Sequence, residues 1–393
     1  MEEPVEPYIL DAVRTPFGRN RGGLSGVRID DLAAHPITAL VKRHPGLDPA
    51  RIAEVVYGNS NGAGEDNRNV ARMAVLLSGL PETTPAVTVN RLCGSGAEAI
   101  AQAARLIRTG EADLVIAGGV EGMSRAPYVL PPIDQALPRD LALLPTTIGW
   151  RMANPEFPSR WTESLGTSAE RVATEKGIGR AAQDDWALRS HQRAHAAWQN
   201  GLHDGYVTEC AGVTRDECIR PGTTPDALAA LAPAFTRDGT VTAGNSSPIN
   251  DGAVAVLIGS EQAAADLGVD PIARIAGSAV AALAPDRFAL APVPAIHKLL
   301  GRAGRTLADL DVVELNEAFA AMVLSCLDEL PGLDPERVNP NGGAIALGHP
   351  IGASAARAVA DCARHLRRTG GGLGLTAACI GVGQGIAVLL ETP

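Results

Sequence analysis

Aromatic residues and long apolar runs are scarce in this chain. Phe, Trp and Tyr make up 3% of its 393 residues, so we expect a core of Ala, Val, Leu and Ile, whose small side chains suit closely packed helices and sheets. No run approaches the ~20 apolar residues that cross a bilayer, which argues against a membrane protein. The start, MEEPVEP, is acidic and lacks the apolar stretch of a secretory signal.

Basic residues are also fewer than acidic residues. The formal net charge is −10, which argues against a nucleic-acid partner. A small polyanionic substrate then needs a local cationic patch, because salt screens charges beyond about 8–10 Å. The six cysteines form no CxxC pair, so we expect reduced thiols in a cytoplasm, without disulfides or a metal site.

Several catalytic signatures are missing. The segment GVGQG (381–385) lacks the GxGxxG spacing and the later acidic residue of a dinucleotide site. His191 and His195 stand four residues apart, but HQRAH lacks the HExxH glutamate, so we expect a solvated helix face there. No GxSxG sequence is present, which excludes an α/β-hydrolase elbow.

The chain contains an internal repeat, because segments of its first half recur in its second half. Three segments recur in the same order: a β-branched strand ending in an Asn-containing loop, a Val-Asn turn leading into a helix that closes with Arg-Thr-Gly, and an apolar strand ending in glycines. The pairs are 52–64 with 307–320, 89–110 with 338–370, and 112–123 with 372–385. Strand–helix alternation predicts an α/β fold with buried sheets, and duplication predicts pseudo-twofold packing in which equivalent loops meet.

The helix in each copy has a clear apolar stripe. Gly110 and Gly370 are placed as C-terminal stops, and Pro350 lies at the first turn of the second helix. The stripes consist of Ala97, Ile100, Ala104 and Ile107 in the first copy and Ile351, Ala355, Val359, Cys362 and Leu366 in the second. Between the copies, Pro-rich loops and polar helices such as 180–199 predict an insertion that covers a site.

The equivalent loops deliver Cys93, Asn316, His349 and Cys379 to strand ends or helix starts, where α/β folds bind ligands. A helix dipole can lower the pKa of the Cys93 thiol and keep the His349 imidazole neutral, ready to accept a proton. Each residue also has a structural interpretation: a buried loop cysteine, a capping histidine, a turn asparagine, a buried strand cysteine. Nearby glycines would let a substrate approach backbone N–H donors: Gly94, Gly96, Gly381 and Gly383.

Five motifs in order make the chain similar to the thiolases, acyl-CoA C-acetyltransferases, over essentially its whole length. They are VNRLCGSG, TAGNSSPINDGA, NEAFA, NPNGGAIALGHPIGAS and CIGVGQG. Within the family, segments 64–81, 123–129 and 146–155 most resemble the 3-oxoadipyl-CoA thiolases.

The resemblance implies a five-layered αβαβα core of two duplicated halves with an inserted loop domain, assembled as a dimer or tetramer. The expected division is an N-terminal half of 1–122 plus about 250–270, a covering domain of 123–249 and a C-terminal half of 271–393. The implied reaction is reversible cleavage of a 3-oxoacyl-CoA by coenzyme A, which is a substrate; no cofactor is permanently bound.

The resemblance also implies roles. Cys93 becomes acylated, His349 is the base, Cys379 exchanges the α-proton, and Asn316 holds a water at the enolate oxygen. The backbone N–H groups of Cys93 and Gly381 form an oxyanion hole.

Three further residues are expected to contact coenzyme A or the acyl chain: Ser247 the pantetheine, Arg220 the nucleotide, and Phe319 the acyl group. Family members often have Ala-Ser-Gly where this chain has Ser-Ser-Pro, and Pro248 stiffens that loop and removes an N–H. A 3-oxoadipyl chain needs a cationic or amide-rich pocket for its second carboxylate, with Arg125, Arg151 and Arg160 as candidates.

Three alternatives stay open at this point. An acetoacetyl-CoA-type biosynthetic thiolase uses the same residues. A ketosynthase-type condensing enzyme pairs its cysteine with two histidines, or His and Asn, and Cys379 argues against it. A catalytically silent acyl-CoA-binding protein on this fold does not need the full Cys–His–Cys–Asn set.

Overall fold

The computed structural model describes residues 5–393. Residues 1–4 of the acidic start, on which the expected absence of a secretory signal partly depends, lie outside the described residues. Among the helices of residues 5–393, none combines the length and apolar character needed for a bilayer crossing.

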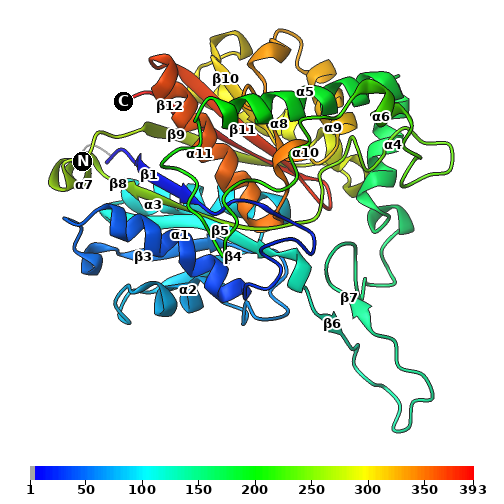
Figure 1. Cartoon of the computed structure of the whole chain (residues 1–393), viewed down its shortest axis with the longest axis horizontal. Coiled ribbons are helices and arrows are strands. Elements are labelled where there is room, and N and C mark those ends of the chain that lie inside the picture. Colours follow the sequence, from blue (N-terminus) through cyan, green and yellow to red (C-terminus); the bar gives the residue numbers. More distant parts are fainter. Residues whose placement is uncertain (1–4) are drawn as a thin grey trace.

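Two halves of the chain repeat one succession of elements, except that the second half has an isolated β-bridge where the first half has the strand β4, Ala86–Val89 (Figure 1). The first half consists of β1 (Tyr8–Arg14), α1 (Ile29–Arg43), β3 (Glu54–Gly58), α2 (Val70–Ser78), β4, α3 (Ser95–Arg108), β5 (Leu114–Gly122) and β8 (Asn250–Gly259). The second consists of β9 (Ala273–Ala282), α8 (Pro292–Ala303), β10 (Val312–Leu315), α9 (Ala320–Glu329), α11 (Ile351–Thr369), β11 (Leu373–Ile380) and β12 (Gln384–Glu391). The short β2 (Gly18–Arg19) pairs with β8, and α7 (Glu261–Leu267) joins the halves.

The strand order is the same in both halves, read outward from the centre. It runs β10-β11-β12-β9-β1-β8-β5-β3-β4, and the two halves join where Tyr8 and Ile9 of β1 pair with β9. At the position in the second half that corresponds to the outermost strand β4, Val338 forms a parallel β-bridge with Val313 of β10. The duplication predicted from three short segments therefore extends over the whole sheet.

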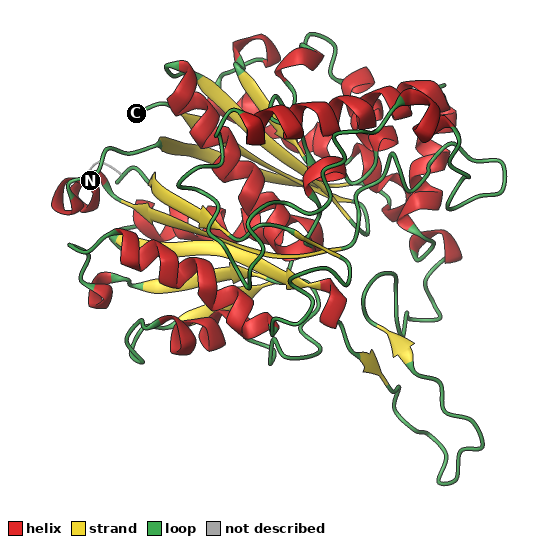
Figure 2. Ribbon diagram, in the orientation of Figure 1, coloured by secondary structure: helices red, strands yellow, loops and turns green. Residues whose placement is uncertain are grey.

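Helices cover both outer faces of the sheets and fill the space between them (Figure 2). One apolar cluster joins α1 and α2 to the first-half strands, another joins α8 and α9 to the second-half strands, and a third contains α3 and α11 with residues of both. Along β3, Val55 and Tyr57 face the outer cluster and Val56 the central one, as the strand period requires. The five-layered αβαβα core is confirmed.

Small residues allow the two central helices to lie between the sheets. A Cβ added to Gly96 of α3 would come within 2.9 Å of the Gly352 carbonyl oxygen of α11, and one on Gly94 would come within 2.6 Å of Ile380. Both glycines therefore serve packing, and the prediction that they open backbone to a substrate is wrong. The predicted helix stops are present, since Gly110 and Gly370 have φ of 71° and 92°.

The segment between the halves carries α4 (Leu165–Glu175), α5 (Arg180–Gln199), α6 (Pro225–Ala229) and the arm strands β6 (Tyr128–Val129) and β7 (Leu144–Pro145). The predicted helix over 180–199 is confirmed. The expected solvated histidine face is wrong, because His191 is 5% exposed. Its Nδ1 accepts the Arg220 N–H at 3.2 Å, and burial lowers the pKa of His191 to about 4.

Candidate active site

Cys93 lies in a tight turn between β4 and α3. The turn is held by local hydrogen bonds: the Leu92 N–H donates to Asn90 Oδ1 at 2.9 Å, and Ser95 Oγ donates to the Leu92 carbonyl at 2.7 Å. Leu92 has φ of 46°, a left-handed conformation uncommon for a residue with a side chain. The sequence therefore places the thiol on a strained strand-to-helix turn, and strain of this kind concentrates at functional sites.

The Cys93 thiol is buried, and this sets its protonation. Its residue is 8% exposed, and burial raises the pKa of the thiol to about 11, while the backbone N–H groups of Gly381 and of Cys93 itself act in the opposite direction. The expectation of a helix-lowered pKa is wrong. The resting group is a thiol, so it needs a base to become a nucleophile.

His349 precedes α11 and follows the short helix α10 (Ala344–Leu347). Its backbone N–H donates to Asn250 Oδ1 at 2.9 Å, and its ring Nδ1 lies 2.6 Å from Ser354 Oγ. The Ser354 hydroxyl donates to the Pro350 carbonyl at 2.8 Å, so its oxygen accepts the Nδ1 hydrogen. This network leaves a lone pair on Nε2, which is buried and has no partner among the described residues.

The imidazole is neutral, as predicted, but the main reason differs. Burial is the largest cause that lowers the pKa of His349 to about 4, and the positive charge of Arg357 adds to it. The helix dipole invoked from the sequence is not needed. At neutral pH this ring can accept a proton on Nε2.

The two central helices bring the Cys93 and His349 loops together. Gly96 lies three residues after Cys93, and Gly352 lies three residues after His349. Helix α3 packs against α11 at these two glycines. The Cys93 turn contacts both α11 and β11. Equivalent loops of the two halves therefore meet at one place.

Asn316 follows β10 at the same edge. Its N–H donates to the Ala377 carbonyl of β11 at 2.9 Å, whereas both atoms of its side-chain amide are buried without a partner among residues 5–393. The next residue, Glu317, anchors this loop by accepting hydrogen bonds from four groups: Trp186 Nε1, Ser190 Oγ, Asn339 Nδ2 and the Ile345 N–H. A fixed backbone with a free buried amide can bind water or a substrate oxygen.

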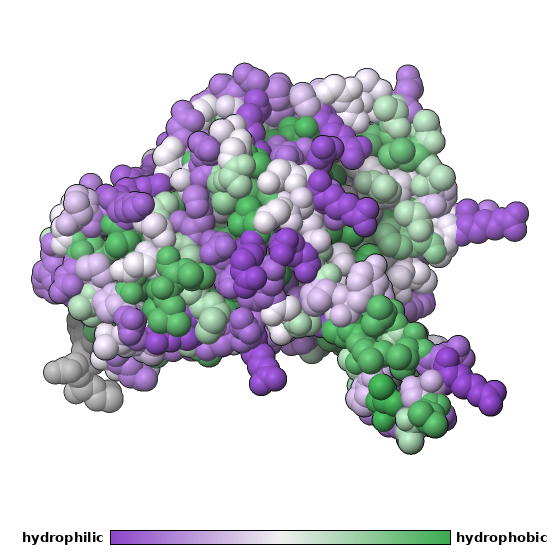
Figure 3. All heavy atoms as spheres, turned by 60° about the horizontal axis from the view of Figure 1, so that its bottom comes forward, coloured by the Kyte–Doolittle hydropathy of each residue, from purple (hydrophilic) through white to green (hydrophobic). Residues whose placement is uncertain are grey.

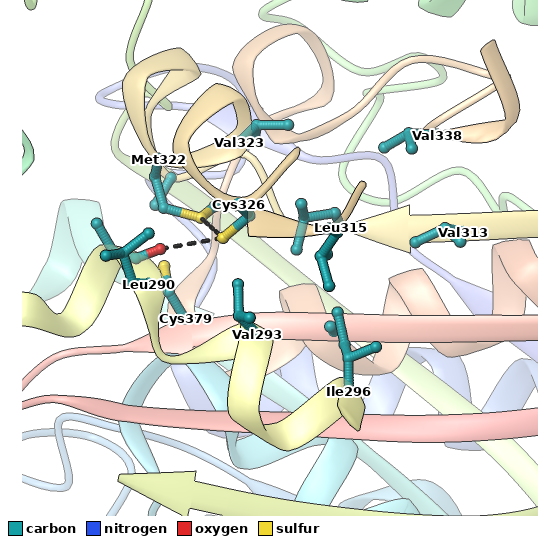
Figure 4. Packing of buried hydrophobic residues seen from close by; sticks show 14 of the residues in the cluster. Leu290, Val293, Ile296, Val313, Leu315, Met322, Val323, Cys326, Val338 and Cys379 are labelled. Atoms are coloured by element: carbon teal, nitrogen blue, oxygen red, sulfur yellow. Dashed lines mark hydrogen bonds between the residues drawn. The ribbon is translucent and has the colours of Figure 1, made fainter. Parts of the chain in front are cut away.

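Cys379 is the penultimate residue of β11 and is 1% exposed. Figure 4 shows Cys379 near Leu290 and Cys326. The Cys326 thiol donates a hydrogen bond to the Ala289 carbonyl at 3.2 Å. Burial raises the pKa of Cys379, and a negative charge on Cys93 would raise it further. The two sulfurs therefore lie close enough to interact electrostatically.

The predicted coenzyme-A residues are less closely grouped. The Ser247 N–H donates to the Ala318 carbonyl at 3.0 Å, which holds its loop beside Phe319. Phe319 is 8% exposed and packs edge-on against Phe235 and Phe288. Arg220 is exposed on the covering segment. Their roles stay predictions.

Sequence reasoning missed Ser354, Glu121 and Trp150. A serine one turn into the helix after His349 was a usable signal for a ring partner. Glu121 ends β5 and accepts hydrogen bonds from the N–H groups of Ser60 and Gly352. Trp150 had no such signal, and its ring lies 3.3 Å from the position of a Cβ on Gly381. Residues 5–393 contain no cluster of His, Cys, Asp and Glu able to hold a metal ion.

Known proteins share both the sequence and the fold. The family models for the thiolase N-terminal and C-terminal domains match residues 7–262 and 269–392. The chain is 50% identical to the beta-ketoadipyl-CoA thiolase of Acinetobacter baylyi over 98% of both chains. It is 49% identical to the 3-oxoadipyl-CoA/3-oxo-5,6-dehydrosuberyl-CoA thiolase of Escherichia coli, covering 98% of this chain and 99% of that one.

A crystal structure of human mitochondrial 3-ketoacyl-CoA thiolase in complex with CoA superposes with a TM-score of 0.92 at 38% identity, covering 99% of this chain and 98% of that one. Thiolases are acyltransferases that cleave 3-oxoacyl-CoA with coenzyme A. The chain belongs to the thiolase family.

Proposed function

We propose that this thiolase acts on 3-oxoadipyl-CoA, with Cys93, His349, Cys379 and Asn316 as its catalytic residues. Relatives from several bacteria that are about 50% identical are named for beta-ketoadipyl-CoA, which supports the substrate. The roles are supported by one arrangement: His349 Nε2 and the Asn316 amide are buried and have no partner among residues 5–393, at the edge where the Gly381 N–H faces the Cys93 thiol.

The first half-reaction forms an acyl-enzyme. His349 Nε2 takes the Cys93 proton, and the sulfur attacks the 3-oxo carbonyl carbon, whose oxygen is stabilised by backbone N–H groups of Cys93 and Gly381. Breaking the bond between the α-carbon and the former carbonyl carbon leaves the shortened acyl group on Cys93. The electron pair goes to the enolate of acetyl-CoA, which a water held by Asn316 and His349 stabilises, and Cys379 protonates its α-carbon.

The second half-reaction transfers the acyl group to coenzyme A. The proton that His349 took from Cys93 first passes to the Cys379 thiolate, which restores a neutral ring. His349 then removes the proton of the incoming thiol, which attacks the thioester on Cys93, and the released Cys93 thiolate regains that proton from His349. A thioester is thereby exchanged for a thioester, so the step remains reversible. This is our reason for a sulfur nucleophile: a serine ester would be a more stable resting point. No cofactor is needed beyond the two coenzyme-A substrates.

A thiolysis panel tests the substrate. We expect kcat/KM to be highest for 3-oxoadipyl-CoA when it is compared with acetoacetyl-CoA and with longer uncharged 3-oxoacyl-CoAs. A preference for acetoacetyl-CoA would instead identify a biosynthetic-type thiolase. Binding of each compound without thiolytic cleavage would identify a silent acyl-CoA-binding protein.

We also propose that the chain self-associates as a dimer or tetramer. The arm around β6 and β7 extends away from the core (Figure 1), and apolar side chains gather on it in Figure 3. Its exposed apolar residues include Tyr128, Leu130, Ile133, Leu137, Leu141 and Leu143, and such patches mark interaction sites. Light scattering on the wild type and on a Leu137→Ser, Leu141→Ser variant tests this: we expect a smaller assembly for the variant.

A cytoplasmic location is proposed from the thiols. All six cysteines are free, and five of them are buried. Fractionation of cells that express the chain tests this proposal.

A further inference from the structure

The three arginines proposed for the second carboxylate differ in their partners. Arg125 forms a two-pronged ion pair with Glu65, with Nε 2.7 Å from Oε2, and Arg160 lies 3.7 Å from Asp286. Among residues 5–393, Arg151 pairs with no carboxylate. Its guanidinium donates to Asn61 Oδ1 at 3.0 Å, a neutral amide. Arg151 is therefore the candidate whose charge is not already compensated.

Arg151 is presented by a strained turn that touches the Gly381 loop. Gly149 and Met152, on either side of the pair Trp150–Arg151, both have left-handed backbones, with φ of 80° and 51°. The Trp150 ring covers Gly381, at 3.3 Å from the position of a Cβ there, and the Gly381 N–H faces the Cys93 thiol. Strain at Met152 is of the kind that persists at functional sites.

Asn61, the hydrogen-bond partner of Arg151, belongs to a loop that is hydrogen-bonded to the turn that carries Cys93. Asn61 follows β3, and its Nδ2 donates to Thr146 Oγ1 at 3.0 Å. The adjacent Ser60 carbonyl accepts a hydrogen bond from Asn90 Nδ2 at 2.8 Å, and Asn90 begins the turn that carries Cys93. The guanidinium is thus half-buried and fixed between two loops of the proposed site.

We propose that Arg151, positioned by Asn61, binds the terminal carboxylate of the acyl group carried by Cys93. The ligand class is an acyl-CoA whose acyl chain ends in a carboxylate. A guanidinium offers several donors in one plane, and only part of this capacity is used on Asn61, so a carboxylate can bind in two-pronged fashion and compensate the charge. This inference rests on the proposed function and assigns the residue that selects the substrate.

The experiment compares two substrates of equal chain length, 3-oxoadipyl-CoA and uncharged 3-oxohexanoyl-CoA. For Arg151→Gln we expect kcat/KM to fall about 10-fold to 100-fold on the charged substrate, the range for one lost charged hydrogen-bond pair. On the uncharged substrate we expect a change of less than about twofold. Arg151→Lys should keep part of the preference, and Arg160→Gln, a matched arginine of the same segment, should change neither value.

Two outcomes overturn the inference while the wild type cleaves 3-oxoadipyl-CoA. One is an equal loss on both substrates, accompanied by a raised KM for coenzyme A, which would place Arg151 at the coenzyme-A phosphates. The other is no loss on either substrate. If the wild type does not cleave 3-oxoadipyl-CoA, the proposed function fails instead, and acylation of Cys93 by succinyl-CoA against butyryl-CoA still tests Arg151. Thermal melting of each variant confirms that it is folded.

Discussion

In the first half of the molecule, two side chains at the strand ends, Asn59 and Glu121, are held by hydrogen bonds. β3 and β5 pair Gly58 with Gly119, so Asn59 follows β3 and Glu121 lies two residues further along β5. Asn59 Nδ2 donates to Glu121 Oε1 at 3.3 Å and to the Val120 carbonyl at 3.2 Å. This carboxylate also accepts N–H groups from the loop after β3 and from the start of α11.

The second half keeps an asparagine at the first of these two positions and has a cysteine in place of the glutamate at the second. β10 and β11 pair Leu315 with Ala377, so Asn316 and Cys379 occupy the places of Asn59 and Glu121. The Asn316 amide has no partner among the described residues. At these positions the first half thus holds loops in place, whereas we propose that the second half offers its side chains to a substrate. Among these two pairs of positions, the Asn316 amide is the buried polar group without a partner among residues 5–393, which costs stability, and it lies in the pair to which we assign catalytic roles beside Cys93 of the first half.

The largest effect on the reaction rate should come from the second half, at Cys379. Cys379→Ala should lower the thiolysis rate about 10²–10⁴-fold, the usual contribution of a general acid or base. Its free energy of unfolding should change by no more than about 1 kcal/mol, since only one sulfur is removed. Steady-state kinetics, α-proton exchange of acetyl-CoA in deuterated water and thermal melting check this. The neighbouring buried Cys326→Ala is the control, and an equal loss of activity there would refute the role of Cys379.

A substitution at Glu121 in the first half should lower the stability more than the activity. Glu121→Gln replaces an acceptor oxygen by an NH2 group that faces N–H donors, which should lower the free energy of unfolding by about 3 kcal/mol. The folded fraction should keep its activity within about tenfold. Chemical denaturation and active-site titration measure the two quantities, with half-buried Glu54→Gln as the control. A catalytic loss without a stability loss would break the comparison.

A smaller effect is expected for Ser354→Ala, which removes the acceptor of the His349 Nδ1 hydrogen. Loss of this one buried hydrogen bond should lower kcat about tenfold while KM stays nearly constant, because the ring can then adopt the wrong tautomer. Ser354→Thr retains the hydroxyl and should recover most of kcat. A change confined to thermal stability would make Ser354 structural only.

The smallest effect concerns pH. With the pKa of His349 lowered to about 4 and that of Cys93 raised to about 11, the pair keeps one protonation state across neutrality. The rate of Cys93 acetylation by acetyl-CoA should change by less than about twofold between roughly pH 6 and pH 8, and should fall as the pH drops toward 4. A titration with its midpoint near an ordinary histidine pKa of about 6.5 would contradict this.

Much of the fold follows from the sequence, because repeats of apolar pattern and helix stops at Gly110 and Gly370 are local signals. The meeting of Cys93 and His349 loops also follows, once equivalent loops of two copies are assumed to converge. What could not be predicted depends on burial. The raised pKa of Cys93, the buried His191 and the packing role of Gly96 all arise from distant segments. The division into two halves and a covering domain stays a prediction.

The most direct test of the account is where an acyl group binds covalently. Cys379→Ala incubated with labelled acetyl-CoA should carry one acetyl group, and peptide mass mapping should locate it on Cys93, with no label on a Cys93→Ala variant. Covalent label that persists in Cys93→Ala, or that maps to another cysteine in the parent, would contradict the central claim that this buried thiol is the nucleophile.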